Sequence, residues 1–236
     1  MDEQLQYLID LQQLDSRIFA LEAEQARLPA QIEAIQARVA EARTAVETLK
    51  GEHDSARKAI RTKEKDLEVS ATKQAKSAAR LYEVKTNKEY SAVLVEIEEI
   101  KQEKARIEDE ILNQMEIQER TTREIQEGEA ALKQTEAEAR QSEAAVRARL
   151  RVVEADLDIV RAERQSLVRQ LPRDLLASYD RLLHHLNGIA VAPVLPGGIC
   201  AGCRVTLTPQ RFQELRQQSS LHNCESCGRY QYWVPA

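Results

Sequence analysis

Apolar residues recur along the first half of the chain at alternating spacings of four and three. Two interleaved heptad series, one starting at Tyr7 and the other at Leu11, run without a break through residue 67. Fifteen of their eighteen positions are apolar or aromatic, and only Gln25, His53 and Lys63 interrupt them. Such a sustained heptad pattern predicts a long helix that packs along one seam as a coiled coil. A lone seam histidine is typical of a tolerated polar layer, so His53 is assigned no ligand role.

A second apolar seam follows later in the chain. It is regular from Ile97 to Ile111 and from Val146 to Leu171, and it is sparse between these stretches. The shortage of large apolar residues there predicts a loosely packed middle section. Up to Leu171 the chain holds only two glycines and one proline, as expected of nearly continuous helix. The proline, Pro29, removes one helical hydrogen bond, so we expect the first helix to kink or restart there.

The two helices are predicted to join near residues 82–88, where the seam lapses. Thr86 and Glu89 have the spacing of a capping box, which starts a new helix. Because this turn lies near the middle of residues 1–171, the two helices have similar lengths and should fold back on each other as an antiparallel hairpin. A parallel homodimeric coiled coil stays open as the alternative, since a heptad pattern alone does not choose between them.

A third helix is predicted over residues 172–188, at the base of the hairpin. Pro172 suits its first turn, leucines at helical spacing give it one apolar face, and Gly188 suits its end. The next ten residues, 189–198, contain two prolines and two glycines and are predicted to be a linker. The uncharged run there is too short to cross a membrane.

The four cysteines of the chain stand as two Cys-x-x-Cys pairs with twenty residues between the pairs: Cys200, Cys203, Cys224 and Cys227. This is close to the spacing of a structural zinc site, because two such turns bring four thiolates to one tetrahedral ion. The opening residues lack the basic and apolar segments of a secretory signal, which argues against paired disulfides. A thioredoxin-like redox motif would need a βαβ setting, which is absent. We therefore predict one structural Zn²⁺ ion bound by all four cysteines.

The flanking residues predict a zinc ribbon. Strand-like runs follow the two pairs at residues 204–207 and 229–234, and Thr208-Pro209 marks the start of a short helix. Gly202 and Gly228 stand where the backbone turns tightly, in conformations that favour glycine. The predicted fold is mainly α: a coiled-coil hairpin over 1–171, a third helix over 172–188, a linker over 189–198, and a zinc ribbon with short strands and one short helix over 199–236.

Charge is unevenly distributed along a chain whose net charge is −5. Residues 55–90 carry ten basic and five acidic groups, and residues 172–236 carry six basic and four acidic groups. The hairpin tip and the ribbon are therefore the positive parts of the sequence. Candidate partner-docking residues at the tip are Lys63, Lys65, Lys73, Lys76, Lys85, Asn87, Lys88 and Tyr90. Candidate nucleic-acid contacts in the ribbon are Arg204, Arg211, Arg216, Arg229, Tyr232 and Trp233.

Both sets have a simpler interpretation as well. The lysines at the tip can form a solvated face, and the ribbon aromatics can pack the ribbon against the third helix. An enzyme is not expected, because four thiolates close the zinc coordination shell and no nucleophile, base or phosphate loop stands out. The favoured function is a non-catalytic adaptor or chaperone-like scaffold that docks protein partners through its rod and basic tip. The alternative is an RNA- or DNA-binding regulator that acts through the ribbon.

The chain resembles a family of bacterial proteins with an N-terminal coiled-coil hairpin and a C-terminal four-cysteine zinc ribbon. The resemblance rests on residues 84–90 and 96–98 at the turn, on 194–203, and on 223–230. It implies a cytoplasmic adaptor without catalytic activity, whose four cysteines bind zinc. It also implies partners among flagellar or type III secretion components, the nitrogen-type sigma factor, or flagellin messenger RNA. The family favours an aliphatic pair after residues 228–229, where this chain has Tyr230 and Gln231, so its ribbon surface is expected to differ.

Overall fold

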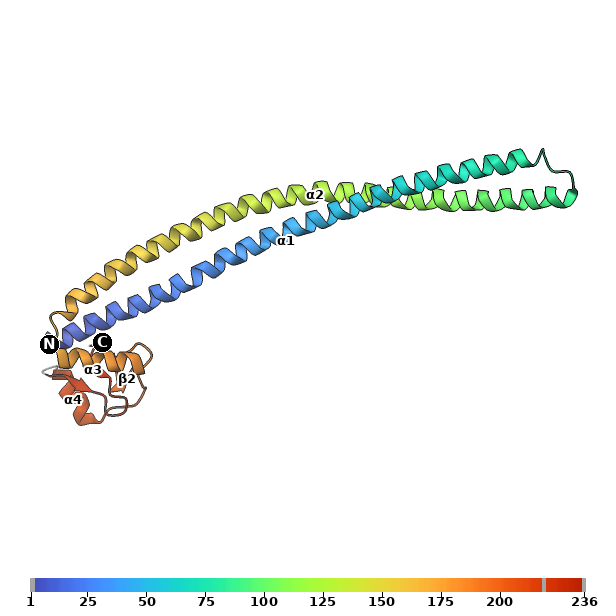
Figure 1. The fold of residues 1–236 in the computed structure, drawn as a ribbon. Helices are drawn as coiled ribbons and strands as arrows, with labels where there is room; N and C mark the ends of the chain where they lie inside the picture. Colours follow the sequence, from blue (N-terminus) through green and yellow to red (C-terminus); the bar gives the residue numbers. More distant parts are fainter. Residues whose placement is uncertain (1–2, 218–219, 235–236) are drawn as a thin grey trace. The chain divides into compact units, whose positions relative to one another are not determined.

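Two long helices account for most of the chain in the computed structural model, which describes residues 3–217 and 220–234 (Figure 1). Helix α1 spans Glu3–Arg80 and helix α2 spans Asn87–Val168. They run antiparallel and are joined by a short turn at residues 81–86. The predicted coiled-coil hairpin is therefore confirmed, with both of its helices supplied by one chain.

The heptad seam explains which side of α1 is covered. All eighteen predicted seam positions are buried or half-buried. The chain divides into two compact units, one formed by residues 1–33 and 144–236 and the other by residues 34–143. In the first unit the seam of α1 packs against that of α2 in a cluster of buried aliphatic residues: Ile18, Leu21, Leu28, Val153, Leu157 and Val160.

In the second unit, ion pairs join the two helices on either side of the seam. Arg43 lies 2.7 Å from Glu136, and Lys50 lies 2.8 Å from Glu129. These pairs are solvent-exposed, so each contributes at most about 1 kcal/mol to stability. Because they join specific positions of the two helices, these pairs favour this antiparallel register.

Helix α1 continues through Pro29 without a break. The sequence predicted a kink or a restart at Pro29, and of these the restart is wrong. Proline removes only one backbone donor, and its neighbour Leu28 is buried in the seam. This seam contact of Leu28 helps to hold the helix together across Pro29.

The turn between the helices is held by the capping box that its sequence indicates. The Thr86 hydroxyl and backbone N–H donate to the Glu89 carboxylate at 2.8 and 3.1 Å, and the Glu89 N–H donates back to the Thr86 hydroxyl at 3.3 Å. The hydroxyl of Thr86, followed by its backbone N–H, lowers the pKa of Glu89. The start of α2 is therefore rigidly defined although it is fully exposed.

Four short strands and two more helices complete the first unit. Helix α3 spans Arg173–His185 and helix α4 spans Pro209–Gln217. The strands are β1 (Val191–Leu195), β2 (Ile199–Cys200), β3 (His222–Asn223) and β4 (Tyr230–Trp233). They form one sheet in the order β2-β1-β4-β3, with β1 parallel to β4 and the other pairs antiparallel.

Strand β1 corrects the prediction of a linker over residues 189–198. Val191, Ala192 and Val194 are buried, and β1 is one of the two inner strands of the sheet. Pro193 suggested irregular chain, but it loses only its donor, and its carbonyl accepts from the N–H of Ala201 at 3.0 Å. The strand predicted at 204–207 is also wrong, since that run makes only one bridge, between Thr206 and Ile199.

None of the helices in the described residues carries an apolar stretch long enough to span a bilayer.

Candidate metal centre

The two Cys-x-x-Cys pairs form turns of the same geometry. In the first turn the N–H of Arg204 donates to the carbonyl of Cys200, and in the second the N–H of Gly228 donates to the carbonyl of Cys224, both at 2.8 Å. The residue after each pair has a left-handed backbone, with φ of 61° at Arg204 and 76° at Gly228. The equivalence of the two turns points two pairs of sulfur atoms at one centre.

The four sulfur atoms have the arrangement that a tetrahedral zinc ion requires. They lie within 4.8 Å of one another, and the Sγ atoms of Cys203 and Cys224 are 3.7 Å apart. A tetrahedral ion with Zn–S bonds of about 2.3 Å places its sulfurs about 3.8 Å apart. A disulfide needs about 2.05 Å, and all four cysteines are free. The set fits one four-coordinate ion with no open position for a substrate.

Arg229 connects the metal centre to the chain that follows α3. Its Nε donates to the carbonyl of Ile189 at 2.8 Å, its Nη2 donates to that of Leu186 at 3.0 Å, and the residue is only 8% exposed. Burial raises the pKa of the Cys227 thiol, but hydrogen bonds from the backbone and side chain of Arg229 outweigh it and lower that pKa to about 7. Because the thiolate is the metal ligand, Arg229 favours the ligand form of Cys227, whereas burial raises the pKa of Cys224 to about 12.

Position 202 requires a glycine because the Arg229 side chain lies directly against its backbone. Its φ is not positive, contrary to our expectation, and Arg204 takes the left-handed position instead. A Cβ atom at Gly202 would lie 2.5 Å from Cδ of Arg229. The Arg229 side chain therefore reaches its two carbonyl acceptors across the bare backbone of the first cysteine turn.

Hairpin and metal centre both match known families. The model of the CT398-like coiled coil hairpin domain matches residues 11–187. This chain belongs to that family. The model of the C4-type zinc ribbon domain matches residues 199–230, so the four cysteines bind one structural zinc ion. A coiled-coil hairpin joined to a zinc ribbon supports, in general terms, a non-enzymatic adaptor or a nucleic-acid-binding role.

Three solved structures with the same fold illustrate the similarity, and each comes from a bacterium. CT398 from Chlamydia trachomatis is 24% identical with a TM-score of 0.85, and each chain is 98% covered. The HP0958 protein from Helicobacter pylori is 19% identical with a TM-score of 0.63, covering 100% of this chain and 99% of its own. A protein from Mycobacterium smegmatis is 17% identical with a TM-score of 0.72, covering 98% and 97%. No curated protein matches the chain in sequence.

A buried ionic cluster holds α3 against the hairpin, next to the ribbon. The Asp15 carboxylate of α1 accepts from the Tyr179 hydroxyl of α3 at 2.8 Å and from Nε of Arg164 in α2 at 2.6 Å. Arg164 also donates to Asp180 at 3.1 Å. Burial, followed by the charge of Asp15, raises the pKa of Tyr179, which therefore remains a donor. Three helices meet at one carboxylate.

Gln12 of α1 makes a second polar connection. Its Nε2 donates to the carbonyl of Gly188 at 2.8 Å, and its Oε1 accepts from the N–H groups of Ala190 and Val191 at 2.6 and 3.0 Å. The chain entering β1 is thereby attached to α1. Sequence reasoning missed this residue and the ionic cluster. The available signal was a second apolar face at the start of α1, because Leu5 and Leu8 lie off the seam and are buried.

The candidate nucleic-acid residues do not form a free basic surface. Arg229 serves the metal centre, so its proposed phosphate contact is withdrawn. Arg211 pairs with Glu214 and Glu225 at 3.1 and 3.0 Å. The two candidate aromatics are half-buried: Tyr232 packs against the core of the first unit and Trp233 packs edge-on against Phe212. The two exposed candidates that remain are Arg204 and Arg216.

The tip residues lie in the second unit, and pairing of the helices cancels their charge. Lys63 pairs with Glu110, and Arg80 pairs with Glu96 at 3.2 Å. Residues 91–120, which face the basic segment, carry nine acidic and four basic groups. The tip is therefore close to neutral, which corrects the expectation of a basic tip. The other predicted tip residues are exposed: Lys65, Lys73, Lys76, Lys85, Asn87, Lys88 and Tyr90.

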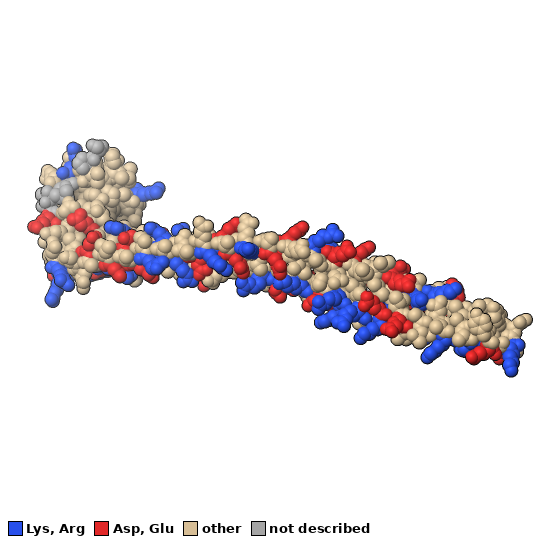
Figure 2. Space-filling view, turned by 90° about the horizontal axis from the view of Figure 1, so that it is seen from above, with Lys and Arg blue, Asp and Glu red and all other residues tan. Residues whose placement is uncertain are grey.

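Exposed apolar side chains lie near the turn, and of these sequence reasoning identified Tyr90 but missed Tyr82, Leu94 and Val95. Tyr82 is 92% exposed, and Tyr90, Leu94 and Val95 are between 43% and 57% exposed. On the face shown in Figure 2, the end of the helical pair has an uncharged area with a few charged side chains along one edge, whereas both signs alternate along its length. We call these four residues with Lys85 and Lys88 the turn surface.

Proposed function

We propose that the protein is a non-catalytic adaptor that docks protein partners through its hairpin, mainly at the turn surface. The observation that carries this proposal is the exposure of Tyr82, Tyr90, Leu94 and Val95 next to the capped start of α2. Exposed aromatic side chains of this kind are typical of binding hot spots. The zinc ribbon has a structural role in this proposal.

The distribution of charge near the turn indicates what kind of partner the turn surface suits. The basic excess of residues 55–90 is balanced by the acidic segment that pairs with it, so long-range attraction to a polyanion is weak. Lys85 and Lys88 are exposed and lie between Tyr82 and Tyr90 in the chain. This mixture of apolar and basic side chains suits a protein surface with an apolar pocket and an acidic rim. By family resemblance, the candidate partners are secretion, flagellar or sigma-factor components in the cytoplasm.

The nucleic-acid alternative has less support. Binding driven by phosphates needs several available cations on one face. Two of the four candidate arginines in the ribbon, Arg211 and Arg229, are already engaged with protein groups. No feature of the described ribbon favours this function over protein docking.

The test uses site-specific photocrosslinking in the native host. A photoreactive amino acid replaces Tyr82 in one strain and Leu112 in another, because Leu112 is also exposed (58%) and lies in the same unit outside the turn surface. We expect a discrete protein adduct from position 82 only, lost when Leu94 is changed to Ala. Binding of the identified partner should change little between low and high salt.

Two results would contradict the proposal. One is recovery of the same partners, at the same yield, by a chain carrying Tyr82→Ala and Leu94→Ala. The other is retention of the purified protein on RNA at low salt, abolished by Arg204→Ala together with Arg216→Ala, which would establish the nucleic-acid alternative instead.

A further inference from the structure

Helix α2 carries a second row of apolar residues, which by helix geometry lies on nearly the opposite side of the helix from the seam. Its six positions repeat at alternating spacings of three and four, and all are exposed: Ala145, Ala148, Val152, Ala155, Ile159 and Ala162. The seam that packs on α1 uses other positions of the same segment, among them Val153, Leu157 and Val160. We call the six exposed residues the outer row. It lies in the first unit, so it is separate from the turn surface on which the proposed function rests.

The composition of the outer row indicates that it has a partner. Alanine alone would not, because it is a strong helix former that suits any exposed helical position. Val152 and Ile159 have no such explanation, since their branched side chains lower helix propensity and are 50% and 55% exposed. The positions beside the row are mostly charged, for example Arg151 and Asp158. An apolar row with charged flanks, sustained over about two and a half heptads, is the pattern of a second coiled-coil seam.

The outer row is complementary in shape to itself when a second copy lies antiparallel. Around a two-fold axis between positions 153 and 154, Val152 would face the partner's Ala155. The same register sets Ile159 opposite the partner's Ala148, and Ala145 opposite the partner's Ala162. Each large side chain then meets a small one, which allows the two helices to approach closely without a gap.

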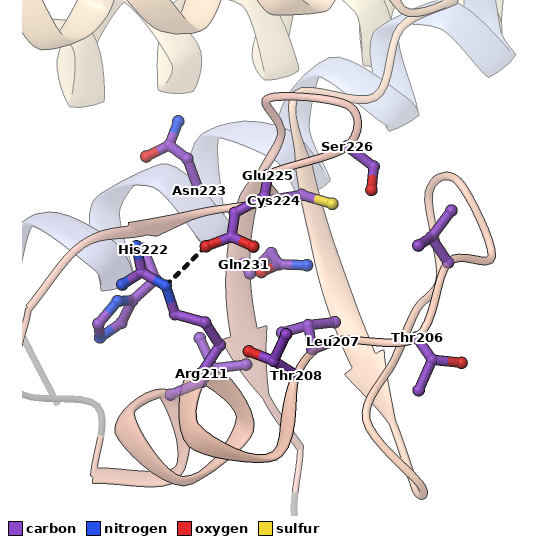
Figure 3. A pocket seen from close by; sticks show the side chains of 12 residues that line it. Thr206, Leu207, Thr208, Arg211, His222, Asn223, Cys224, Glu225, Ser226 and Gln231 are labelled. Carbon is purple, nitrogen blue, oxygen red and sulfur yellow. Dashed lines mark hydrogen bonds and ion pairs between the residues drawn. The ribbon is translucent and has the colours of Figure 1, made fainter.

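The charges beside the row favour this register over others. It places Arg151 next to the partner's Asp158, and the two-fold axis repeats the contact with the roles exchanged. Within the described residues neither side chain has a hydrogen bond or ion pair, whereas Arg211 of the ribbon is already neutralised by Glu225 at 3.0 Å (Figure 3). A shift by one heptad would set Asp158 against the partner's Asp158, or, in the other direction, Arg151 against the partner's Arg151. A parallel pair would set Asp158 against the partner's Glu163. Like charges in such positions disfavour an arrangement.

We propose that the outer row of α2 binds a second copy of this chain as an antiparallel helix pair, with two Arg151–Asp158 ion pairs between the copies. The row is about 26 Å long at 1.5 Å per residue. A contact of this length is near the lower limit of about 1,000 Å² for a specific interface. The dimer is therefore reversible, with a dissociation constant on the order of 10⁻⁵ M. The heptad seam of α1 has no part in it, because α1 and α2 of one chain already cover that seam.

The test is sedimentation equilibrium of the full-length, zinc-loaded chain over a wide range of concentration. Ile159→Lys places an ammonium group in the apolar contact and should abolish the dimer. Leu112→Lys, an equally exposed change in the second unit, is the matched control and should leave the dimer intact. Arg151→Glu and Asp158→Arg should each weaken self-association about tenfold, since each sets like charges together twice. Lys133→Glu, an exposed change on α2 outside the row, alters the net charge as Arg151→Glu does and should have no effect.

Mixing the two charge variants tests the register itself. An equimolar mixture of the Arg151→Glu and Asp158→Arg chains restores both ion pairs, so a mixed dimer should form with about the affinity of the parent. Circular dichroism and zinc content should match the parent in every variant, because all the changed side chains are exposed in the single chain.

Four results would overturn the proposal. The first is a parent chain that stays monomeric up to millimolar concentration, and the second is a dimer that survives Ile159→Lys. The third is tighter association of Asp158→Arg, which would indicate the parallel pair. The last is a mixture of the two charge variants that associates no better than its components.

Discussion

The strongest stability prediction concerns the carboxylate at which three helices meet. The Asp15 side chain is only 5% exposed and accepts short hydrogen bonds from Arg164 and from the fully buried Tyr179. Asp15→Ala leaves the Tyr179 hydroxyl buried without a partner and Arg164 with one carboxylate, Asp180. Removing one partner of a buried pair costs about 3–5 kcal/mol. Because Arg164 is 28% exposed and keeps Asp180, we expect a loss of about 3 kcal/mol.

Asp180 supplies the matched control. It binds the same guanidinium group, but its side chain is 49% exposed. Exposed pairs contribute about 0.2–1 kcal/mol, so Asp180→Ala should cost well under 1 kcal/mol. Tyr179→Phe, which removes only the hydroxyl, should fall between the two at about 1–2 kcal/mol.

Native-state hydrogen exchange is the suitable assay, because a chain of several parts need not unfold in one step. The free energy of opening is measured at the amides of α3 in each variant. The ratio of the losses in opening free energy caused by Asp15→Ala and Asp180→Ala tests whether burial makes the Asp15 contacts stronger. Equal effects of the two alanine variants, or a loss below about 0.5 kcal/mol for Asp15→Ala, would show that the cluster does not hold α3 to the hairpin.

Three further substitutions test the metal centre, and a fourth, Gly51→Ala in α1, serves as a control. Gly202→Ala should displace the Arg229 side chain and weaken zinc retention, as measured by competition with a chelator. Gly51→Ala has free space around the added Cβ atom, so it should stabilise α1 by about 1 kcal/mol in thermal melts. Arg204→Gly should raise the melting temperature of the ribbon, because the left-handed backbone at this position is unfavourable for arginine but not for glycine. An unchanged or lower melting temperature would refute this argument. Cys227→Ser, or removal of zinc, should unfold the ribbon while the helical circular dichroism of the hairpin persists, since zinc contributes on the order of 10–16 kcal/mol to such small domains. An ordered, zinc-free ribbon would contradict this.

Patterns within short stretches were sufficient to predict the helical hairpin, the start of its second helix and the zinc ligands. Heptad spacing identified the covered side of α1, Thr86 and Glu89 identified the start of α2, and the two cysteine pairs identified the zinc ligands. Each signal depends on residues a few positions apart, whose relation is set by the geometry of a helix or a tight turn. The capping box and the zinc turns work locally, so they can be recognised without knowing what lies next to them.

Features that join distant parts of the chain could not be predicted in this way. The central strand β1 exists because β2 and β4 pair with it from both sides, and this outweighs the proline in its sequence. Arg229 looks like a phosphate contact until the carbonyls of Leu186 and Ile189, some forty residues earlier, are found beside it.

The charge of the tip shows the same dependence. Lys63 and its neighbours form a basic segment in the sequence, and only the folding back of α2 brings Glu110 and the acidic stretch around it into contact. Local spacing specifies which side of a helix is apolar. Which polar groups become buried or neutralised depends on pairs separated by tens to hundreds of residues, and their energies arise only when tertiary packing removes water from between them.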